Sequence, residues 1–99
     1  MKKLLMTAIA AGFLLSTSAS ALEAPAKAVT CIGCHGADGN SVVPNFPNIA
    51  GQHASYLEKQ LKDFRDGFRK DASMAAFAKG LTDEEIKALA AFYAAQPAK

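Results

Sequence analysis

The sequence is poor in cysteine, in excess charge and in long apolar runs. It holds two cysteines among 99 residues, and its formal net charge at pH 7 is only +2. Nucleic-acid-binding proteins usually carry a basic patch or stripe, and no such stretch is visible. The apolar run at residues 4–15 is shorter than the ~20 residues that a membrane-spanning helix needs. We therefore expect no nucleic-acid partner and no helix that spans a membrane.

The first 21 residues have the layout of a secretory signal peptide. Two lysines precede the apolar run, and the small residues ASA follow it at 19–21, as a cleavage site requires. The alternative is a retained membrane anchor, but residues 16–20 are small and polar where an anchor would stay apolar. Cleavage after Ala21 leaves nine basic and nine acidic side chains in residues 22–99. We predict an exported, formally neutral domain with no stable membrane insertion.

Residues 22–99 predict one all-α domain of three or four helices joined by long loops. Neither an alternating strand pattern nor a repeat or linker is visible in this part. A short helix is expected over 23–35, whereas the segment 36–51, rich in Gly, Asn and Pro, should be loop. Because a domain of this size buries only about 60% of its unfolded surface, its stability is marginal without an additional stabilising element. A disulfide, a metal or a large apolar cofactor could supply that stabilisation.

Two longer helices are predicted in the second half of the chain. The first lies within 52–69, where apolar residues recur at helical spacing, and Gly67 is expected to mark its fraying end. The apolar residues are Leu57, Leu61, Phe64 and Phe68. The second covers 81–96 and begins with a capping box, in which Thr82 is the N-cap and Glu85 its reciprocal partner. Between them, 70–80 is predicted to be a loop with one helical turn.

The two cysteines belong to the motif Cys-Ile-Gly-Cys-His at 31–35. A thioredoxin-like redox pair is one interpretation, but it needs a strand-rich scaffold. A structural zinc site is another, although the remaining methionine and His53 would complete the four ligands poorly. A disulfide would close a very small loop and so stabilise the fold little through chain entropy.

The Cys-x-x-Cys-His motif is the attachment signature for c-type haem. On one helical turn, the sulfurs of Cys31 and Cys34 can both reach the vinyl groups of one porphyrin and form thioethers. His35 then lies beneath the iron and supplies an axial nitrogen. The porphyrin would also act as a large apolar core element in a small domain. We therefore predict one covalently bound haem c.

The ligand on the other face of the iron decides what such a protein does. An open face binds or activates small molecules, whereas a methionine closes it and favours electron transfer. Met74 is the one methionine left after signal cleavage, and His53 is the one other histidine. Met74 lies in a predicted loop that can fold over the haem, although a methionine is commonly core filler. His53 is expected to face water at a helix start.

Three stretches resemble the class I c-type cytochromes of the small bacterial periplasmic kind. They are CIGCHGADG at 31–39, PNIAGQ at 47–52 and SMAAFAKGLTDEEIKALAAFYA at 73–94. The resemblance covers nearly all of residues 22–99 and implies the cytochrome c fold, wrapped around one haem, and a periplasmic location.

The resemblance also implies roles for single residues. His35 and Met74 become the axial ligands of the haem iron, and the Pro47 carbonyl accepts the Nδ1 proton of His35. Such a bond orients the ring and tunes the metal. One departure is Ala75, since some relatives have proline after the ligating methionine.

Further residues are expected around the haem and between the first and last helices. The candidate haem-pocket residues are Phe46, Ile49, Leu57, Leu61, Phe64, Phe77 and Leu81. The helix contact implied by the resemblance joins Ala28 to Leu89, Phe92 and Tyr93. Ordinary core packing would account for all of these residues equally well.

The predicted function is that of a one-electron carrier rather than an enzyme. Transient redox partners would dock at the exposed haem edge through a small interface, and the protein would be a monomer or a weak dimer. Two alternatives remain open. The chain could be a haem c subunit of a larger oxidoreductase, or an open-site haem protein that binds or reduces small molecules.

Overall fold

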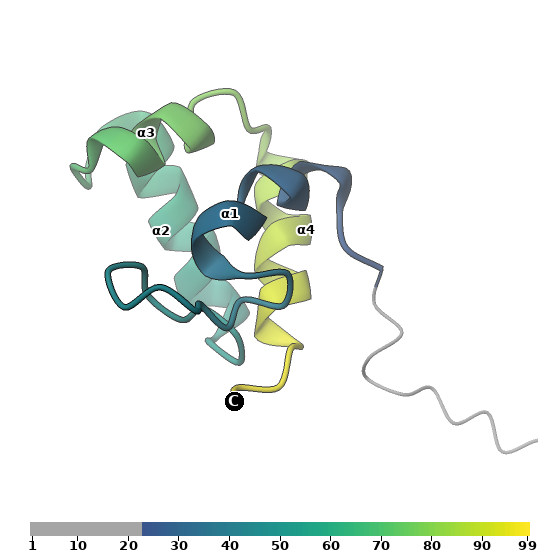
Figure 1. Ribbon diagram of the computed structural model, residues 1–99. Coiled ribbons are helices and arrows are strands. Elements are labelled where there is room, and N and C mark those ends of the chain that lie inside the picture. The colour runs from purple at the N-terminus through teal and green to yellow at the C-terminus, as the bar shows by residue number, and fades with distance from the viewer. Residues whose placement is uncertain (1–22) are drawn as a thin grey trace, which may run out of the picture.

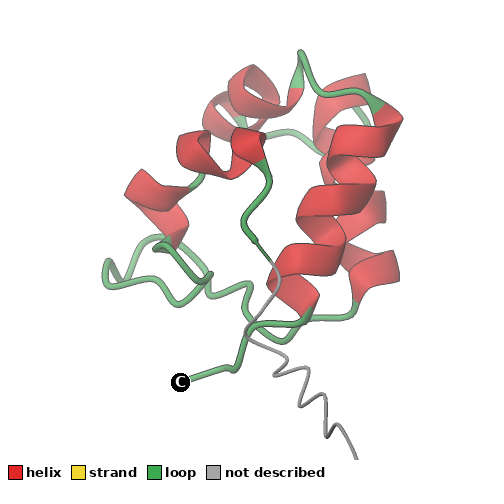
Figure 2. Cartoon of the chain, turned by 90° about the vertical axis from the view of Figure 1, so that its right-hand side faces the viewer, coloured by secondary structure: helices red, strands yellow, loops and turns green. Residues whose placement is uncertain are grey.

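A computed structural model describes residues 23–99. The predicted signal peptide and its cleavage site lie outside the described residues. The described part contains helices and loops only, which confirms the all-α prediction (Figure 2). Its elements are the 3-10 helix η2 (Ala26–Thr30), α1 (Ile32–His35), α2 (Ala54–Asp66), α3 (Ala72–Ala78) and α4 (Asp83–Ala94). Within residues 23–99, no helix is both long enough and apolar enough to cross a membrane.

The longer helices α2 and α4 pack against each other, and α3 packs on α2. Figure 1 shows α1 in front of this pair, with α3 at the upper left. The segment between α1 and α2 is irregular, as predicted, and it winds around the lower front of the molecule. Helix α1 itself packs on η2, and η2 packs on α4.

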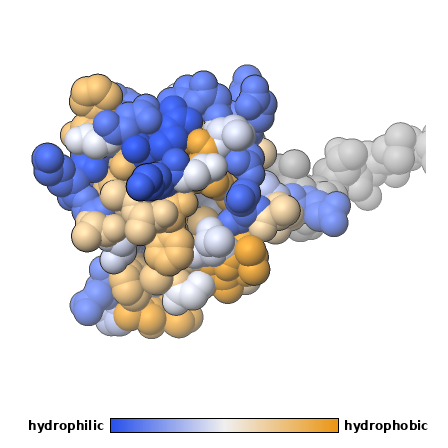
Figure 3. All heavy atoms as spheres, turned by 90° about the horizontal axis from the view of Figure 1, so that it is seen from above, coloured by the Kyte–Doolittle hydropathy of each residue, from blue (hydrophilic) through white to orange (hydrophobic). Residues whose placement is uncertain are grey.

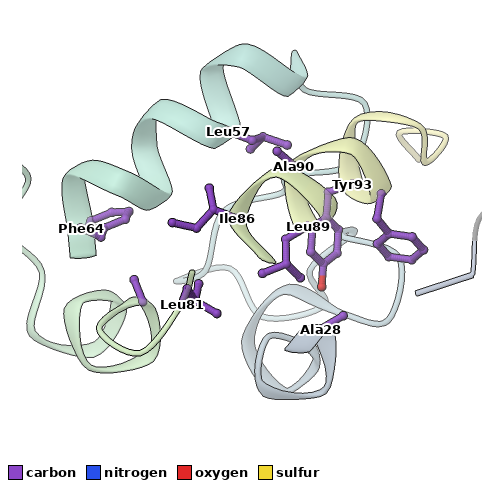
Figure 4. Packing of buried hydrophobic residues seen from close by; sticks show 10 residues of the cluster. Ala28, Leu57, Phe64, Leu81, Ile86, Leu89, Ala90 and Tyr93 are labelled. Carbon is purple, nitrogen blue, oxygen red and sulfur yellow. The ribbon is translucent and has the colours of Figure 1, made fainter. Parts of the chain in front are cut away.

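Helix α4 starts where the sequence predicts. The Thr82 hydroxyl accepts a bond from the Glu85 N–H at 3.1 Å, and the Glu85 carboxylate accepts one from the Thr82 N–H at 3.0 Å. This reciprocal pair is the predicted capping box. Ile86 and Leu89 from this helix are the largest fully buried side chains of the described chain (Figure 4). The cap thus fixes the register in which α4 presents its apolar face to the core.

The predicted contact between the first and last helices is confirmed. Ala28 on η2 is 1% exposed and belongs to one buried cluster with Leu89, Phe92 and Tyr93 of α4. Figure 4 shows Leu89 and Tyr93 pointing from α4 toward the turn that carries Ala28. A small residue at position 28 allows this close approach of the two backbones.

Helix α2 ends at Gly67, as the sequence predicts. Gly67 adopts φ +87°, in the left-handed region that glycine tolerates best, and its N–H donates to the Asp63 carbonyl. Leu57 and Phe64 are buried as expected, but Phe68 is 84% exposed. The prediction for Phe68 was wrong, because the chain leaves the helix at Gly67 and the helical spacing no longer applies.

The segment 70–80 forms a helix where a loop with one turn was predicted. Helix α3 covers Ala72–Ala78, and Asp71 is its N-cap. The Asp71 carboxylate accepts a hydrogen bond from the Met74 N–H at 2.9 Å. Met74 therefore stands in the first turn of a helix and not in a loop. Four alanines and a capping aspartate favour a helix locally.

Hydrogen bonds and an ion pair connect the segment after α4 to the loop that follows α1. The Asn40 side chain donates to the Pro97 carbonyl at 3.0 Å and accepts from the Lys99 N–H at 2.8 Å. The Lys99 ammonium lies 3.2 Å from the Asp38 carboxylate. These contacts join residues that are more than fifty positions apart in the chain.

The Asp38 contacts predict a loss of stability in acid. Hydrogen bonds from the backbone and then the side chain of Asn40, followed by Lys99, lower the pKa of Asp38 to about 2. Since the unfolded carboxyl has its ordinary, higher pKa, this contribution is complete above pH 4 and is lost as the pH falls toward 2. Asp38→Asn should therefore lose less stability than wild type across that window. Urea titrations at several pH values measure this, with Glu23→Gln as a control that removes a carboxylate elsewhere. Equal acid sensitivity in all three proteins would contradict the prediction.

Candidate functional site

A cavity of about 460 Å³ lies between the helices and the loop that follows α1. This volume is in the range of about 300–1,000 Å³ that small-molecule and cofactor sites occupy. All eight candidate site residues line it, namely Cys31, Cys34, His35, Pro47, Ile49, Phe64, Met74 and Phe77. The structure thus brings together side chains from α1, α2, α3 and the intervening loop.

The wider set of candidate pocket residues lines the cavity with one exception. Phe46, Leu57 and Leu61 also line the cavity. Leu81 does not line it and instead belongs to the buried core cluster. It lies directly before α4, where its carbonyl accepts a hydrogen bond from Arg65 Nη1 at 3.1 Å. The bond from Arg65 fixes the Leu81 backbone, and the Leu81 side chain packs in the core.

Helix α1 holds the two thiols and the imidazole on a single turn. The His35 N–H donates to the Cys31 carbonyl at 2.9 Å, and the turn ends at Gly36, which adopts φ +80°. A Cβ at position 36 would lie 2.3 Å from the Asn40 carbonyl oxygen, so glycine is required there. Cys31 and Cys34 are both free thiols and both partly buried. Both cysteines also line the cavity.

His35 is the one buried polar or charged side chain in the described chain, with 7% exposure. Its Nδ1 lies 2.8 Å from the Pro47 carbonyl oxygen. Because a carbonyl oxygen can only accept, Nδ1 must donate and therefore carries the proton. Nε2 is left as the unprotonated nitrogen, which is the form that binds a metal. The loop after α1 thus fixes the tautomer as well as the orientation of the ring.

Met74 reaches the same cavity from another element. It is partly buried in the first turn of α3, where it packs against the hydrophobic core. The Asp71 cap fixes the position of its backbone. His53, the other candidate ligand, is exposed at the N-cap of α2 and does not line the cavity. The cavity walls therefore contain one imidazole and one thioether.

Tyr93 is a cavity residue whose place in the wall was not predicted. Its hydroxyl is buried and has no hydrogen-bond partner within the described chain. Burial, and to a smaller extent the neighbouring Cys31, raises the pKa of Tyr93 above its usual range. A buried hydroxyl without a partner costs about 1–3 kcal/mol. An unpaired hydroxyl in this wall is therefore consistent with a cavity that holds another group.

Several polar residues of the cavity wall also escaped prediction. Tyr56 and Gln60 precede Phe64 at intervals of four residues, which places all three on one face of α2. That spacing could have identified them. Arg69 lies beyond the end of α2, and no local pattern marks it as a wall residue.

The donor set fits a covalently held porphyrin better than a bare metal. Within residues 23–99, no three or more His, Cys, Asp or Glu side chains are grouped so that they could hold a metal ion. The cavity is mostly apolar, with two thiols and one imidazole on the same helical turn. A planar apolar ring that forms two thioethers and takes one nitrogen ligand satisfies all of these features.

Comparison with known proteins agrees with this geometry. The family model described as Cytochrome c matches residues 23–94. The chain is 48% identical over 73 residues to cytochrome c-554(548) of Halomonas halodenitrificans, covering 71% of this chain and 88% of that protein. It is 43% identical over 83 residues to cytochrome c4 of Pseudomonas aeruginosa, covering 84% of this chain and 41% of that protein.

A solved structure shows the same fold. Reduced recombinant cytochrome c4 from Pseudomonas stutzeri superposes with a TM-score of 0.63 at 38% identity. The match covers 68% of this chain and 38% of that one, so this chain spans less than half the length of these cytochrome c4 proteins. The chain therefore belongs to the cytochrome c family and carries haem c, for which residues 31–35 provide the attachment motif.

Proposed function

We propose that the protein is a one-electron carrier whose haem iron has His35 and Met74 as its axial ligands. When bound, haem c supplies a reversible ferric/ferrous couple. The observation that carries the proposal is that His35, from α1, and Met74, from α3, line one cavity together with both thiols. Cys31 and Cys34 would hold the ring through thioethers, and Pro47 would keep His35 Nε2 directed to the metal through the bond at Nδ1.

The apolar wall would favour the reduced state. Ferric haem carries one more positive charge than ferrous haem, and burying charge among apolar side chains is costly. Ile49, Phe64 and Phe77 supply such side chains to the cavity. The soft sulfur of Met74 acts in the same direction, since His/Met ligation raises the potential of c-type haem.

Export and docking complete the proposal. Residues 1–21 would direct the chain to the periplasm and be removed after Ala21, leaving residues 22–99 as the working domain. Phe46 and Phe77 line the cavity and are 38% and 49% exposed. Redox partners would dock briefly near this rim, and the carrier would be a monomer or a weak dimer. Figure 3 shows that apolar residues reach the surface over a broad area of one face.

Carbon monoxide tests whether both faces of the iron are closed. A potentiometric titration of the purified holoprotein should give a single one-electron wave. The ferrous protein at neutral pH should then barely change its visible spectrum when carbon monoxide is added, because Met74 occupies the sixth position. Rapid and complete formation of a carbon monoxide adduct would support the open-site alternative and overturn the assignment of Met74.

A further inference from the structure

Arg69 is a charged residue in an otherwise mostly apolar wall. Among the described residues it is the one lysine or arginine that lines the cavity. Arg69 and the neighbouring Lys70 are both exposed residues, but Lys70 does not line the cavity. The one acidic wall residue, Asp71, is engaged as the cap of α3 through the Met74 N–H. Arg69 therefore supplies the one positively charged side chain of this cavity wall among the described residues.

Three contacts hold Arg69 in place. Its guanidinium carbon lies 4.6 Å from the centroid of the Phe64 ring, and Nη1 donates to the Gln60 side-chain oxygen at 2.8 Å. Its backbone N–H donates to the Asp63 carbonyl at 3.1 Å, directly after the left-handed turn at Gly67. Phe64 and Gln60 are themselves wall residues. These contacts hold the guanidinium against the wall, although Arg69 is an exposed residue.

Arg69 has no carboxylate partner in the part of the chain that the structure describes. Arg65, one turn earlier, shows the contrast: it forms ion pairs with Asp66 at 2.9 Å and with Asp83 at 2.7 Å. A guanidinium has five N–H donors in a planar fork that matches a carboxylate. Arg69 uses one of them on Gln60, so the remainder are available to a ligand.

We propose that Arg69 forms the carboxylate-binding part of this cavity and pairs with a propionate of the bound haem. Haem has its vinyl groups and its two propionates on opposite edges of the ring. The thiols of α1 would fix the vinyl edge, so the propionates extend away from α1. The connection between α2 and α3, which carries Arg69, lies at the left edge of the molecule in Figure 1, whereas η2 and α4 lie on the right. The inference rests on haem binding and deepens the proposed function.

The pair has a redox consequence. A propionate with no partner places a full negative charge near the iron and stabilises the ferric state. Arg69 would neutralise that charge and favour the ferrous state. Removing the guanidinium should lower the ferrous/ferric equilibrium constant about three- to tenfold, because a unit charge some way from the iron acts through a high effective dielectric. A tenfold change corresponds to about 59 mV for one electron.

Arg69→Gln and Lys70→Gln form a matched pair for the test, since each removes one positive charge from the same loop. Both are measured as holoproteins by potentiometric titration at neutral pH, and resonance Raman spectroscopy records the propionate bending modes. We expect Arg69→Gln to lower the ferrous/ferric constant about three- to tenfold, and to shift a propionate mode. Lys70→Gln should do neither. Arg69→Lys keeps the charge without the planar fork, and should shift the mode while recovering most of the potential.

The role of Arg69 would be overturned if Arg69→Gln and Lys70→Gln changed the ferrous/ferric equilibrium constant equally. It would also be overturned if the propionate bending modes were unchanged in both variants. The sulfur-to-iron charge-transfer band of the ferric protein separates this failure from failure of the proposed function. If wild type lacks that band, Met74 is not a ligand, yet the Raman comparison still decides whether Arg69 contacts a propionate.

Discussion

A variant with both Cys31→Ser and Cys34→Ser should lose all of its covalently attached haem. The two thioethers would be the only covalent bonds between the chain and the ring, and both cysteines line the cavity that would hold it. Acidified acetone should extract the haem from the double variant but not from wild type. Intact-mass analysis should show the added tetrapyrrole on the wild-type chain alone.

The double variant should also be severely destabilised. Without the ring, the mostly apolar walls of the cavity would be exposed to water, at a cost of about 25 cal/mol per Å² of apolar surface. An ordinary domain has only about 5–15 kcal/mol of stability in total. We therefore expect the haem-free chain to collapse around the cavity or to unfold, which circular dichroism and urea titration would detect.

The single variants Cys31→Ser and Cys34→Ser are the controls. Each retains one thioether and should keep its haem through acid extraction, so loss of haem in the double variant cannot be assigned to a general folding defect. Retention of extraction-resistant haem by the double variant would show that some other residue makes the covalent bond.

The parts of the fold that the sequence predicted correctly are specified by local patterns. The capping box of α4 involves Thr82 and Glu85, three residues apart, and both bonds are present. The apolar face of α2 follows from helical spacing, and Leu57 and Phe64 are buried on it. Where the prediction was wrong, a single backbone conformation decided the outcome, as at Gly67 before the exposed Phe68.

Helix α3 was missed for a different reason. Its seven residues are too few to show helical periodicity, and an isolated helix of this length is not stable in water. It persists because Asp71 caps it and because Ala78 is buried, with 1% exposure, in the common core. Packing of this kind joins distant segments, so the alanines and the capping aspartate of 70–80 were too weak a signal by themselves.

The same distinction applies to the site. Residues 31–35 form a local motif, and their placement on one turn follows from their spacing. The bond between His35 and Pro47 joins residues twelve positions apart, and only the resemblance to the family indicated it. Arg69 and Tyr93 enter the wall because the end of α2 and the face of α4 meet the cavity, a matter of tertiary geometry. Sequence motifs therefore predicted the attachment of the haem better than the polar groups around it.

Met74→Leu should remove the sulfur ligand while leaving the packing nearly unchanged. Leucine and methionine have similar volumes, and exchanges between them usually cost less than about 1.5 kcal/mol. Met74 is partly buried against the core and lines the cavity, so a leucine can fill the same space. If Met74 were only core filler, the variant would be spectroscopically silent. If Met74 ligates the iron, the variant must lose the sulfur-to-iron charge-transfer band.

Loss of the sulfur should have two further effects on the holoprotein. The midpoint potential should fall by roughly 0.1–0.3 V, a fraction of the ~0.8 V range over which axial ligands set haem potentials. The ferrous form should bind carbon monoxide readily, because one face of the iron is open. Ser73→Ala, an adjacent substitution that also alters the cavity wall, should keep the band, the potential and the resistance to carbon monoxide. An unchanged spectrum and potential in Met74→Leu would remove Met74 from the iron, and the protein would then belong with haem proteins that bind small molecules.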